Sequence, residues 1–254
     1  MQQLQPRDLV WDGCLNVREL GGLPTRDGGE TRLGAIVRAD SVRQLSAAGW
    51  QALVHHGVRT VIDLRGDHER ADDPLTDVPV AVVEAPFLFE NAGDRDALDE
   101  ELDAAVAAAP DVATATRDVY LIFLERFGAN VAAAVRAVAY APDGAIVIHC
   151  MGGKDRTGLL SAFLLDLAGV EDEEIAADYA LSEERLRPRH ERWFEAAASE
   201  EERERLRRIA QTPAASMIGV FEELRRRYGG VGAYLRSAGV TDDELDLVRA
   251  RLRD

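Results

Sequence analysis

One strand–loop–helix segment constrains the fold of this chain more than any other feature. Ala145–His149 is a compact apolar run that follows the turn signal Pro142-Asp-Gly144 and leads into a glycine-rich loop. Such a run predicts a buried strand. Beyond the loop, Leu159–Ala168 is apolar almost all round and ends at Gly169, which is typical of a core helix. A buried strand followed directly by a buried helix predicts an α/β fold with a mainly parallel sheet.

The rest of the chain adds strands and helices to this unit. Further apolar runs predict strands at 58–64, 78–83 and 35–37. Helices are expected at 97–109, 114–127 and 130–140, from an N-cap at Ser46 to Gly57, and from a capping box at Thr241 through Leu252. No internal repeat or low-complexity linker is visible, so the 254 residues predict a single domain, 1–254.

The amino-acid composition limits the classes of partner that this protein is expected to bind. The chain has 30 Lys and Arg against 46 Asp and Glu, a net charge of −16, which argues against nucleic acid or an anionic membrane surface. No apolar run is long enough for a membrane span, and no secretory signal is visible at the N-terminus, so we expect a cytoplasmic protein. With only Cys14 and Cys150, a disulfide framework is excluded.

The segment 183–210 is unusually charged. Between Glu183 and Arg208, 16 of 26 residues are Asp, Glu, Lys or Arg, with few large apolar positions. This pattern predicts a pair of helices with a narrow buried stripe, and Ser199 with Glu202 fits a capping box for the second helix. Two interpretations stay open: a solvated helical face, and a lid that docks weakly over a site.

The loop between the buried strand and the core helix carries the chemistry. Cys150 ends the strand, and Arg156 follows after five intervening residues, where the helix begins. Backbone N–H groups of such a loop can point inward, and the helix adds its positive dipole end, so the loop can cradle an anion. The glycines permit close approach to a phosphate. The residues expected to line the bound phosphate are Met151, Gly152, Gly153, Lys154 and Thr157.

A cysteine and an arginine in this cradle indicate phosphoryl transfer. The Arg156 fork can bind two phosphate oxygens, and the same positive field favours the nucleophilic thiolate of Cys150. Attack on phosphorus would expel an alcohol or phenol, and water would then hydrolyse the thiophosphate, with a general acid that becomes a base. Thr157 can assist as a donor to the sulfur, or be an ordinary residue of the first helical turn.

At these residues the chain resembles the cysteine-dependent protein tyrosine phosphatase superfamily, whose signature is His-Cys-x5-Arg-Ser/Thr. The fuller loop His149–Gly158 resembles the bacterial tyrosine and dual-specificity branch, as do Asn16–Gly22, Val61–Arg65 and Tyr228–Leu235. The resemblance implies a three-layer fold with a roughly four-stranded sheet between helices, a phosphocysteine intermediate, and neither metal nor cofactor. It implies phosphotyrosine proteins as substrates, phosphoserine, phosphothreonine and phosphoinositides as candidate further substrates, and phosphate or vanadate as ligands. We expect a monomer.

The general acid is where the chain departs from the superfamily pattern. Many tyrosine phosphatases carry this acid in a Trp-Pro-Asp tripeptide, which is absent here. Asp155 is favoured, because the loop is also similar to that of myotubularin lipid phosphatases, where the matching aspartate is thought to be the acid. Asp63, at the end of a predicted strand, is the second candidate; either carboxylate could instead pair with a nearby arginine. Lys154 would extend recognition toward multiply charged headgroups, or be a solvated surface lysine.

Two other functions remain to be weighed. A catalytically silent module could use the cradle to bind phosphate, although such a module has no use for Cys150. Thiol redox chemistry of the arsenate reductase kind also uses a Cys-x5-Arg loop, but it needs resolving cysteines, and only Cys14 is present. The sequence therefore favours a phosphomonoesterase.

Overall fold

A mixed five-stranded sheet organises the part of the chain that the computed structural model describes, residues 7–75, 77–88 and 95–253. The strands are β1 (Arg18–Glu19), β2 (Ile36–Ala39), β3 (Val58–Asp63), β4 (Ala81–Glu84) and β5 (Ala145–His149). Their order in the sheet is β1-β2-β5-β3-β4. The last four are parallel, and β1 pairs antiparallel with β2 at the edge. The expected parallel sheet is therefore confirmed, with one short antiparallel strand added.

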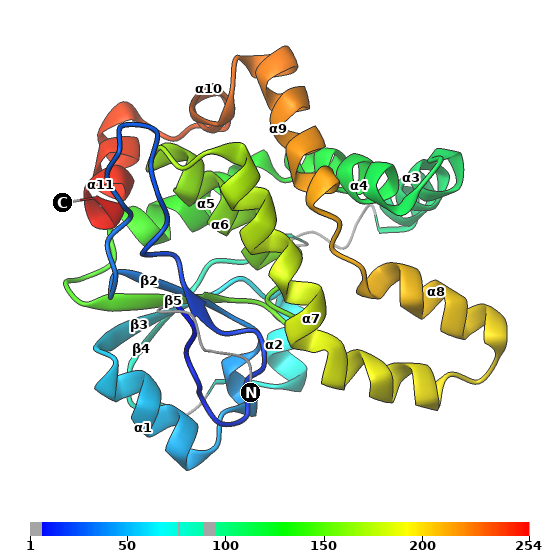
Figure 1. The fold of residues 1–254 in the computed structure, drawn as a ribbon, viewed down its shortest axis with the longest axis horizontal. Helices are drawn as coiled ribbons and strands as arrows, with labels where there is room; N and C mark the ends of the chain where they lie inside the picture. The colour runs from blue at the N-terminus through cyan, green and yellow to red at the C-terminus, as the bar shows by residue number, and fades with distance from the viewer. Residues whose placement is uncertain (1–6, 76, 89–94, 254) are drawn as a thin grey trace.

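Alternation along the strands divides the interior into two cores. Ile146 and Ile148 of β5 point into the larger core, whereas Val147 joins the smaller one on the opposite face. Both faces are therefore covered, as parallel sheets require. Figure 1 shows the resulting layers, with α1 (Ala47–His55) on one side of the sheet and α5 (Gly128–Ala139) and α6 (Arg156–Leu167) on the other. The three-layer fold is confirmed.

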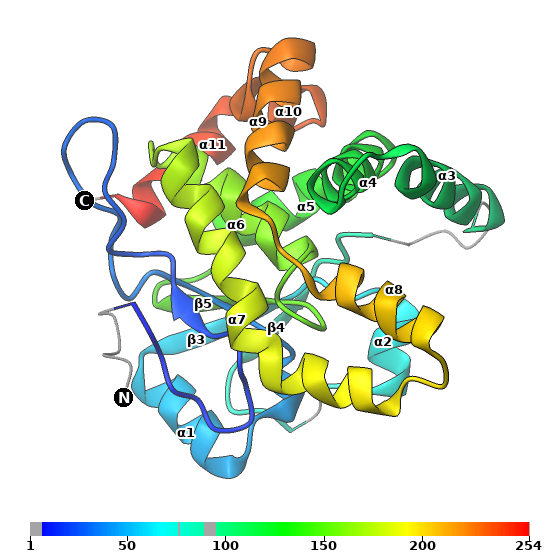
Figure 2. The same cartoon turned by 45° about the vertical axis from the view of Figure 1, so that its right-hand side comes forward.

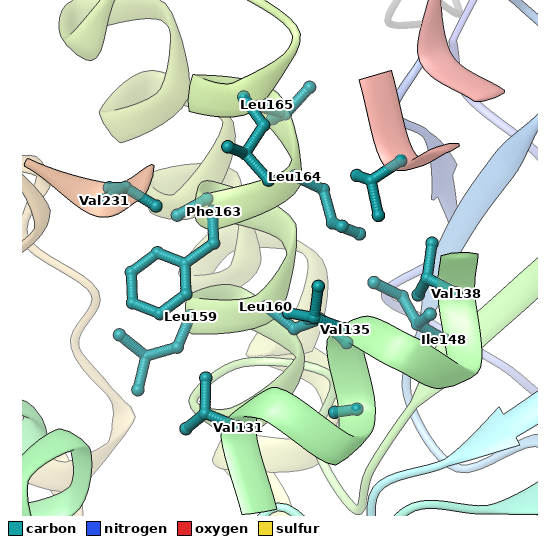
Figure 3. Close-up of a cluster of buried hydrophobic side chains, with 14 of the residues drawn as sticks. Val131, Val135, Val138, Ile148, Leu159, Leu160, Phe163, Leu164, Leu165 and Val231 are labelled. Carbon is teal, nitrogen blue, oxygen red and sulfur yellow. The ribbon is translucent and has the colours of Figure 1, made fainter. Parts of the chain in front are cut away.

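The larger core is built around α6. This helix is buried on nearly every side, with ten of its twelve residues buried, as its uniformly apolar sequence predicts. Figure 3 shows Phe163 and Leu159 of α6 directed toward Val131 and Val231, while Leu160 approaches Val135 of α5. This packing fixes the first turn of α6, where the glycine-rich loop ends.

Eight further helices and one 3-10 turn complete the described part of the chain. They are α2 (Asp67–Asp72), α3 (Arg95–Ala108), α4 (Val112–Arg126), α7 (Asp172–Ala196), α8 (Glu200–Ala210), α9 (Ala214–Tyr228), α10 (Val231–Ser237) and α11 (Asp242–Leu252), with a 3-10 turn at Val42–Gln44. Ser46 and Thr241 cap α1 and α11 as predicted. Ser199 also caps α8, but the Glu202 carboxylate accepts from the N–H of Ala198 and not of Ser199, so the expected capping box is only half formed.

The charged segment 183–210 forms a helical hairpin. Its first arm is the second half of α7, which continues through Pro188, and its second arm is α8. Figure 2 shows the hairpin projecting from the core helices on the side where α2 and α3 lie. Thr212 ties the two arms together, because its hydroxyl accepts from the N–H of Glu183 and its own N–H donates to the Glu183 carboxylate.

Candidate active site

The predicted site residues gather at the carboxyl edge of the parallel sheet. Cys150 follows β5 directly and is only 2% exposed. The preceding residue, His149, is in register with Ala39 of β2 and with Asp63 of β3. Because parallel strands end at the same edge, Asp40, Asp63 and Cys150 are brought together there.

The loop from Cys150 to α6 depends on one glycine more than on the other. Gly153 has a φ of +64°, and a Cβ at this position would lie 2.4 Å from the Ala39 carbonyl oxygen. Only glycine fits this combination of left-handed backbone and close approach. At Gly152, by contrast, a Cβ would find no atom closer than 3.9 Å. The backbone geometry therefore requires glycine at residue 153, whereas the protein itself leaves room for a Cβ at residue 152.

Residues from the N-terminal part of the chain hold this loop from outside. Asn16 Nδ2 donates to the carbonyl oxygens of Gly152 and Gly153, each at 3.1 Å, and Arg38 Nη2 donates to the Gly153 carbonyl at 2.8 Å. Both side chains are fully buried. Asn16 and Arg38 thus hold the loop carbonyls outward, which leaves the inner side of the loop to its N–H groups.

A buried aspartate binds three arginines behind the loop. The Asp178 carboxylate binds Arg18 at 3.0 Å, Arg38 at 2.6 Å and Arg7 at 2.5 Å. Burial alone would raise the pKa of Asp178, but the charges of Arg18 and Arg38 outweigh it and hold the pKa far below its usual value. Asp178 is therefore ionised and joins α7 to β1 and β2.

Arg156 is held by a carboxylate that the sequence did not single out. Glu69 of α2 binds both terminal nitrogens of the guanidinium, with Nη2 to Oε1 at 2.7 Å. Burial tends to lower the pKa of Arg156, but the hydrogen bond with Glu69 and the charge of Cys150 outweigh it and raise the pKa. A guanidinium has five N–H groups, so this end-on pair leaves its Nε edge for a phosphate.

The carboxylate of Asp63 forms an ion pair with Arg65. The Arg65 side chain donates to both carboxylate oxygens, with Nη2 to Oδ2 at 2.8 Å, and the Arg65 N–H adds a bond of 3.0 Å. Burial raises the pKa of Asp63, but these hydrogen bonds outweigh it and lower the pKa. Burial also lowers the pKa of His149, whose Nε2 lies 3.6 Å from Asp63. The arginine pairing that the sequence left as the alternative is thus the one observed for Asp63.

Asp155 has a different environment. It does not make the hydrogen-bonded pair with Arg156 that the sequence left open, since Glu69 holds that guanidinium. Its Oδ1 instead accepts from Tyr120 of α4 at 2.6 Å and lies 3.3 Å from Lys154 Nζ. The Asp155 side chain remains 44% exposed, so it can meet a bound ester.

Lys154, Met151 and Thr157 differ in accessibility. The Lys154 ammonium donates to the Ile209 carbonyl of α8 at 2.5 Å, and its side chain is 12% exposed, which contradicts a solvated surface lysine. Met151 is 44% exposed at the mouth of the loop. Thr157 is fully buried, and its hydroxyl has no hydrogen-bond partner among the described residues, so the expected bond to the Cys150 sulfur is not formed in this structure.

The second cysteine belongs to the opposite face of the sheet. Cys14 packs against the smaller core, whereas Cys150 belongs to the larger one. Burial and the neighbouring Asp40 raise the pKa of Cys14, and its Sγ lies 3.4 Å from the Ser41 carbonyl oxygen. Cys14 is therefore a poor candidate for a resolving thiol.

An apolar cavity adjoins the exposed side of Asp155. It has a volume of about 390 Å³ and lies between α3, α4 and α8, with Val112 and Val119 in one wall and Lys154 beside Asp155. No cluster of three or more metal-ligating side chains occurs in residues 7–75, 77–88 and 95–253. Within the same ranges, no helix is long and apolar enough to cross a bilayer.

Sequence reasoning missed Glu69, Tyr120 and Asp178. Glu69 lies in a six-residue helix with no buried residue, which has no clear apolar pattern. Tyr120 and Asp178 lie within longer helices, where a tyrosine or an aspartate carries no motif. The one available signal was position, because Glu69 follows shortly after Asp63 at the carboxyl end of β3.

Comparisons with known proteins show to which family this chain is similar. The model of the tyrosine phosphatase family matches residues 9–254. A tyrosine-protein phosphatase of Nostoc commune is 30% identical over 224 residues, which cover 86% of this chain and 74% of that protein. The triple specificity protein phosphatase PtpB of Mycobacterium tuberculosis is 27% identical over 272 aligned positions, which cover 93% of this chain and 99% of that protein.

Proposed function

Because the chain belongs to the tyrosine phosphatase family, we propose that it hydrolyses phosphotyrosine in proteins through a phosphocysteine intermediate. The observation that supports this most is the position of Cys150, buried at the base of a loop whose carbonyls are held outward and whose arginine is fixed by Glu69. Such a loop binds a phosphate dianion by its N–H groups and by Arg156.

The proposed reaction consists of two successive displacements at phosphorus. In the first, Cys150 Sγ forms a bond to phosphorus while the ester P–O bond breaks, and Asp155 gives a proton to the leaving oxygen. In the second, Asp155 takes a proton from water, whose oxygen attacks phosphorus and expels the thiolate. Arg156 binds the equatorial phosphate oxygens in both steps.

The environments of the two aspartates favour Asp155 as the acid. Asp63 is buried and its low pKa keeps it ionised, so it has no proton to give at neutral pH. Asp155 is half exposed and adjoins the cavity in which a leaving group could lie. In this proposal Asp63 holds the side chain of Arg65 in its orientation, and Asp155 exchanges the proton with the substrate and with water.

Phosphoserine, phosphothreonine and phosphoinositides are proposed as further substrates. Lys154 and the apolar cavity beside it support the last of these, because a phosphoinositide offers both extra negative charge and apolar chains. The alternative function, a silent phosphate-binding module, is less favoured because the loop retains Cys150 and Arg156. Cytoplasmic location, a single domain and a monomeric state stay predictions.

Trapping the intermediate tests the mechanism directly. Enzyme quenched in acid during turnover of a ³²P-labelled phosphotyrosine peptide should carry the label on Cys150, and Cys150→Ser should carry none. Rates on phosphotyrosine and phosphoserine peptides and on phosphoinositide vesicles then rank the substrates. Binding of the phosphotyrosine peptide with no turnover of p-nitrophenyl phosphate would favour the silent module instead.

We also propose that the 183–210 hairpin acts as a lid. Lys154 contacts Ile209 of α8, and Arg189 of α7 donates to the Met151 carbonyl at 3.4 Å and also binds Asp40. These contacts join both arms of the hairpin to the catalytic loop or its support. Hydrogen exchange over residues 183–210 should change when vanadate binds, and unchanged protection would reject the lid.

A further inference from the structure

Two tyrosine hydroxyls form a chain that ends on Asp155. The Tyr120 hydroxyl donates to Asp155 Oδ1 at 2.6 Å, and the Tyr179 hydroxyl of α7 lies 2.9 Å from that of Tyr120. An ionised carboxylate can only accept, so Tyr120 gives its single hydrogen to Asp155. The hydroxyl of Tyr179 must then donate to Tyr120. The chain therefore runs in one direction, from Tyr179 to Tyr120 to Asp155.

Both rings are locked in place. Tyr120 and Tyr179 are each 1% exposed, and their ring centroids lie 6.2 Å apart in an edge-to-face arrangement. Tyr179 also packs on Gly158, where a Cβ would lie 3.1 Å from its ring. Burial, and then the charge of Asp155, raise the pKa of both tyrosines, so their hydroxyls remain donors at neutral pH.

We infer that Tyr120, supported by Tyr179, is a positioning residue that fixes Asp155 for proton transfer. The inference rests on the proposed role of Asp155 as acid and base. With Oδ1 bound by Tyr120 and close to Lys154, the other oxygen, Oδ2, exchanges the proton. Oδ2–H gives its proton to the leaving oxygen as the P–O bond breaks, and Oδ2 takes one from water as the S–P bond breaks. Tyr120 keeps its own hydrogen in both steps.

The pH dependence of the rate is a second readout of this bond. A hydrogen-bond donor such as the Tyr120 hydroxyl interacts more strongly with a carboxylate than with a protonated acid, so the wild type and a variant without the hydroxyl should differ in their pH profiles. Other groups face this cluster: Lys154, Arg156, His190 and Arg208 around Asp155, and Arg38 and Glu183 around Tyr179. These groups are the same in wild type and variant, so a difference between the two reports on the hydroxyl.

Removal of one oxygen atom provides the test. We compare kcat/KM, which reports the first displacement alone, against pH for wild type, Tyr120→Phe and Tyr179→Phe, with phenyl phosphate as the poor leaving group and p-nitrophenyl phosphate as the activated one. Tyr120→Phe should lose about tenfold on phenyl phosphate and less than about twofold on p-nitrophenyl phosphate. Its pH profile should also differ from that of wild type. Tyr179→Phe should shift both readouts in the same direction by less.

Tyr234→Phe is the matched control. Tyr234 is 2% exposed, and its hydroxyl donates to the Leu124 backbone carbonyl at 2.8 Å, so its loss removes an equally buried bond that does not involve Asp155. This variant should keep the wild-type pH profile and leaving-group dependence. Thermal unfolding of each variant separates loss of stability from loss of positioning.

The outcomes separate this inference from the proposed function. Equal loss on both esters in Tyr120→Phe, with an unmoved pH profile, would overturn the positioning role, provided that Asp155→Asn is selectively slow on phenyl phosphate. If Asp155→Asn slows both esters equally, the assignment of the acid is wrong, and the inference fails with it. Label trapped on Cys150 would stand in either case.

Discussion

Replacing Gly153 with alanine tests how far the loop from Cys150 to α6 depends on a single backbone conformation. The residue has a φ of +64°, and the new Cβ would meet the Ala39 carbonyl oxygen at 2.4 Å. The left-handed conformation costs an alanine about 1–2 kcal/mol. Forcing a methyl into filled space costs about 1–3 kcal/mol more. We therefore expect Gly153→Ala to destabilise the observed conformation of the loop from Cys150 to α6 by at least about 2 kcal/mol, which lowers kcat/KM about thirtyfold.

Gly152→Ala is the neighbouring control, because the nearest atoms to its Cβ lie 3.9 Å away. We expect the thermal midpoint of this variant to stay near that of wild type, since the contact with the rest of the protein is an ordinary van der Waals one. The assay is steady-state hydrolysis of p-nitrophenyl phosphate, together with vanadate affinity and the thermal midpoint of each variant. Full vanadate affinity in Gly153→Ala, or an equal fall of the thermal midpoint in both variants, would refute the reasoning.

Two substitutions and one chemical modification provide further tests. Glu69→Gln removes the charge that fixes Arg156, and kcat/KM should fall about tenfold with little change in thermal midpoint; unchanged kinetics would contradict a positioning role. Asp178→Ala leaves buried arginines unpaired and should cost about 3–5 kcal/mol in urea unfolding. Because the pKa of Asp178 is depressed in the folded protein, its contribution to the free energy of unfolding is complete above about pH 4 and is lost as the pH falls below that. Asp178→Ala should lack this loss of stability in acid. Cys14, whose pKa is raised, should resist iodoacetamide at pH 8 while Cys150 is alkylated, as peptide mass spectrometry would report.

The sequence alone identifies those strands and loops whose own residues carry the signal, without reference to distant partners. β5 has the predicted bounds, Ala145–His149, because every residue in it is buried and apolar or nearly so. β4 begins at Ala81 and not at the predicted residue 78, since this edge strand is only half buried and its residues give a weak signal. The loop and its cysteine and arginine could be predicted for the same reason, because the loop is one contiguous segment.

Features that depend on distant partners could not be predicted. β1 consists of Arg18 and Glu19, two charged residues that can be buried because Arg18 meets an aspartate 160 positions away and Glu19 pairs with His56. The same limit applies to Glu69 and Tyr120, which act on the loop from α2 and α4. Their side chains become informative only when the fold brings them to Arg156 and Asp155.

The strand order has a consequence for how the protein is made. β5 is the last strand to leave the ribosome, yet it lies in the middle of the sheet between β2 and β3. Until it is synthesised, both of those strands present open edges, which invite pairing with other chains. Its insertion closes the gap and delivers Cys150 to the sheet edge in one event. Cys150 thus reaches the sheet edge only when the open edges of β2 and β3 have been covered.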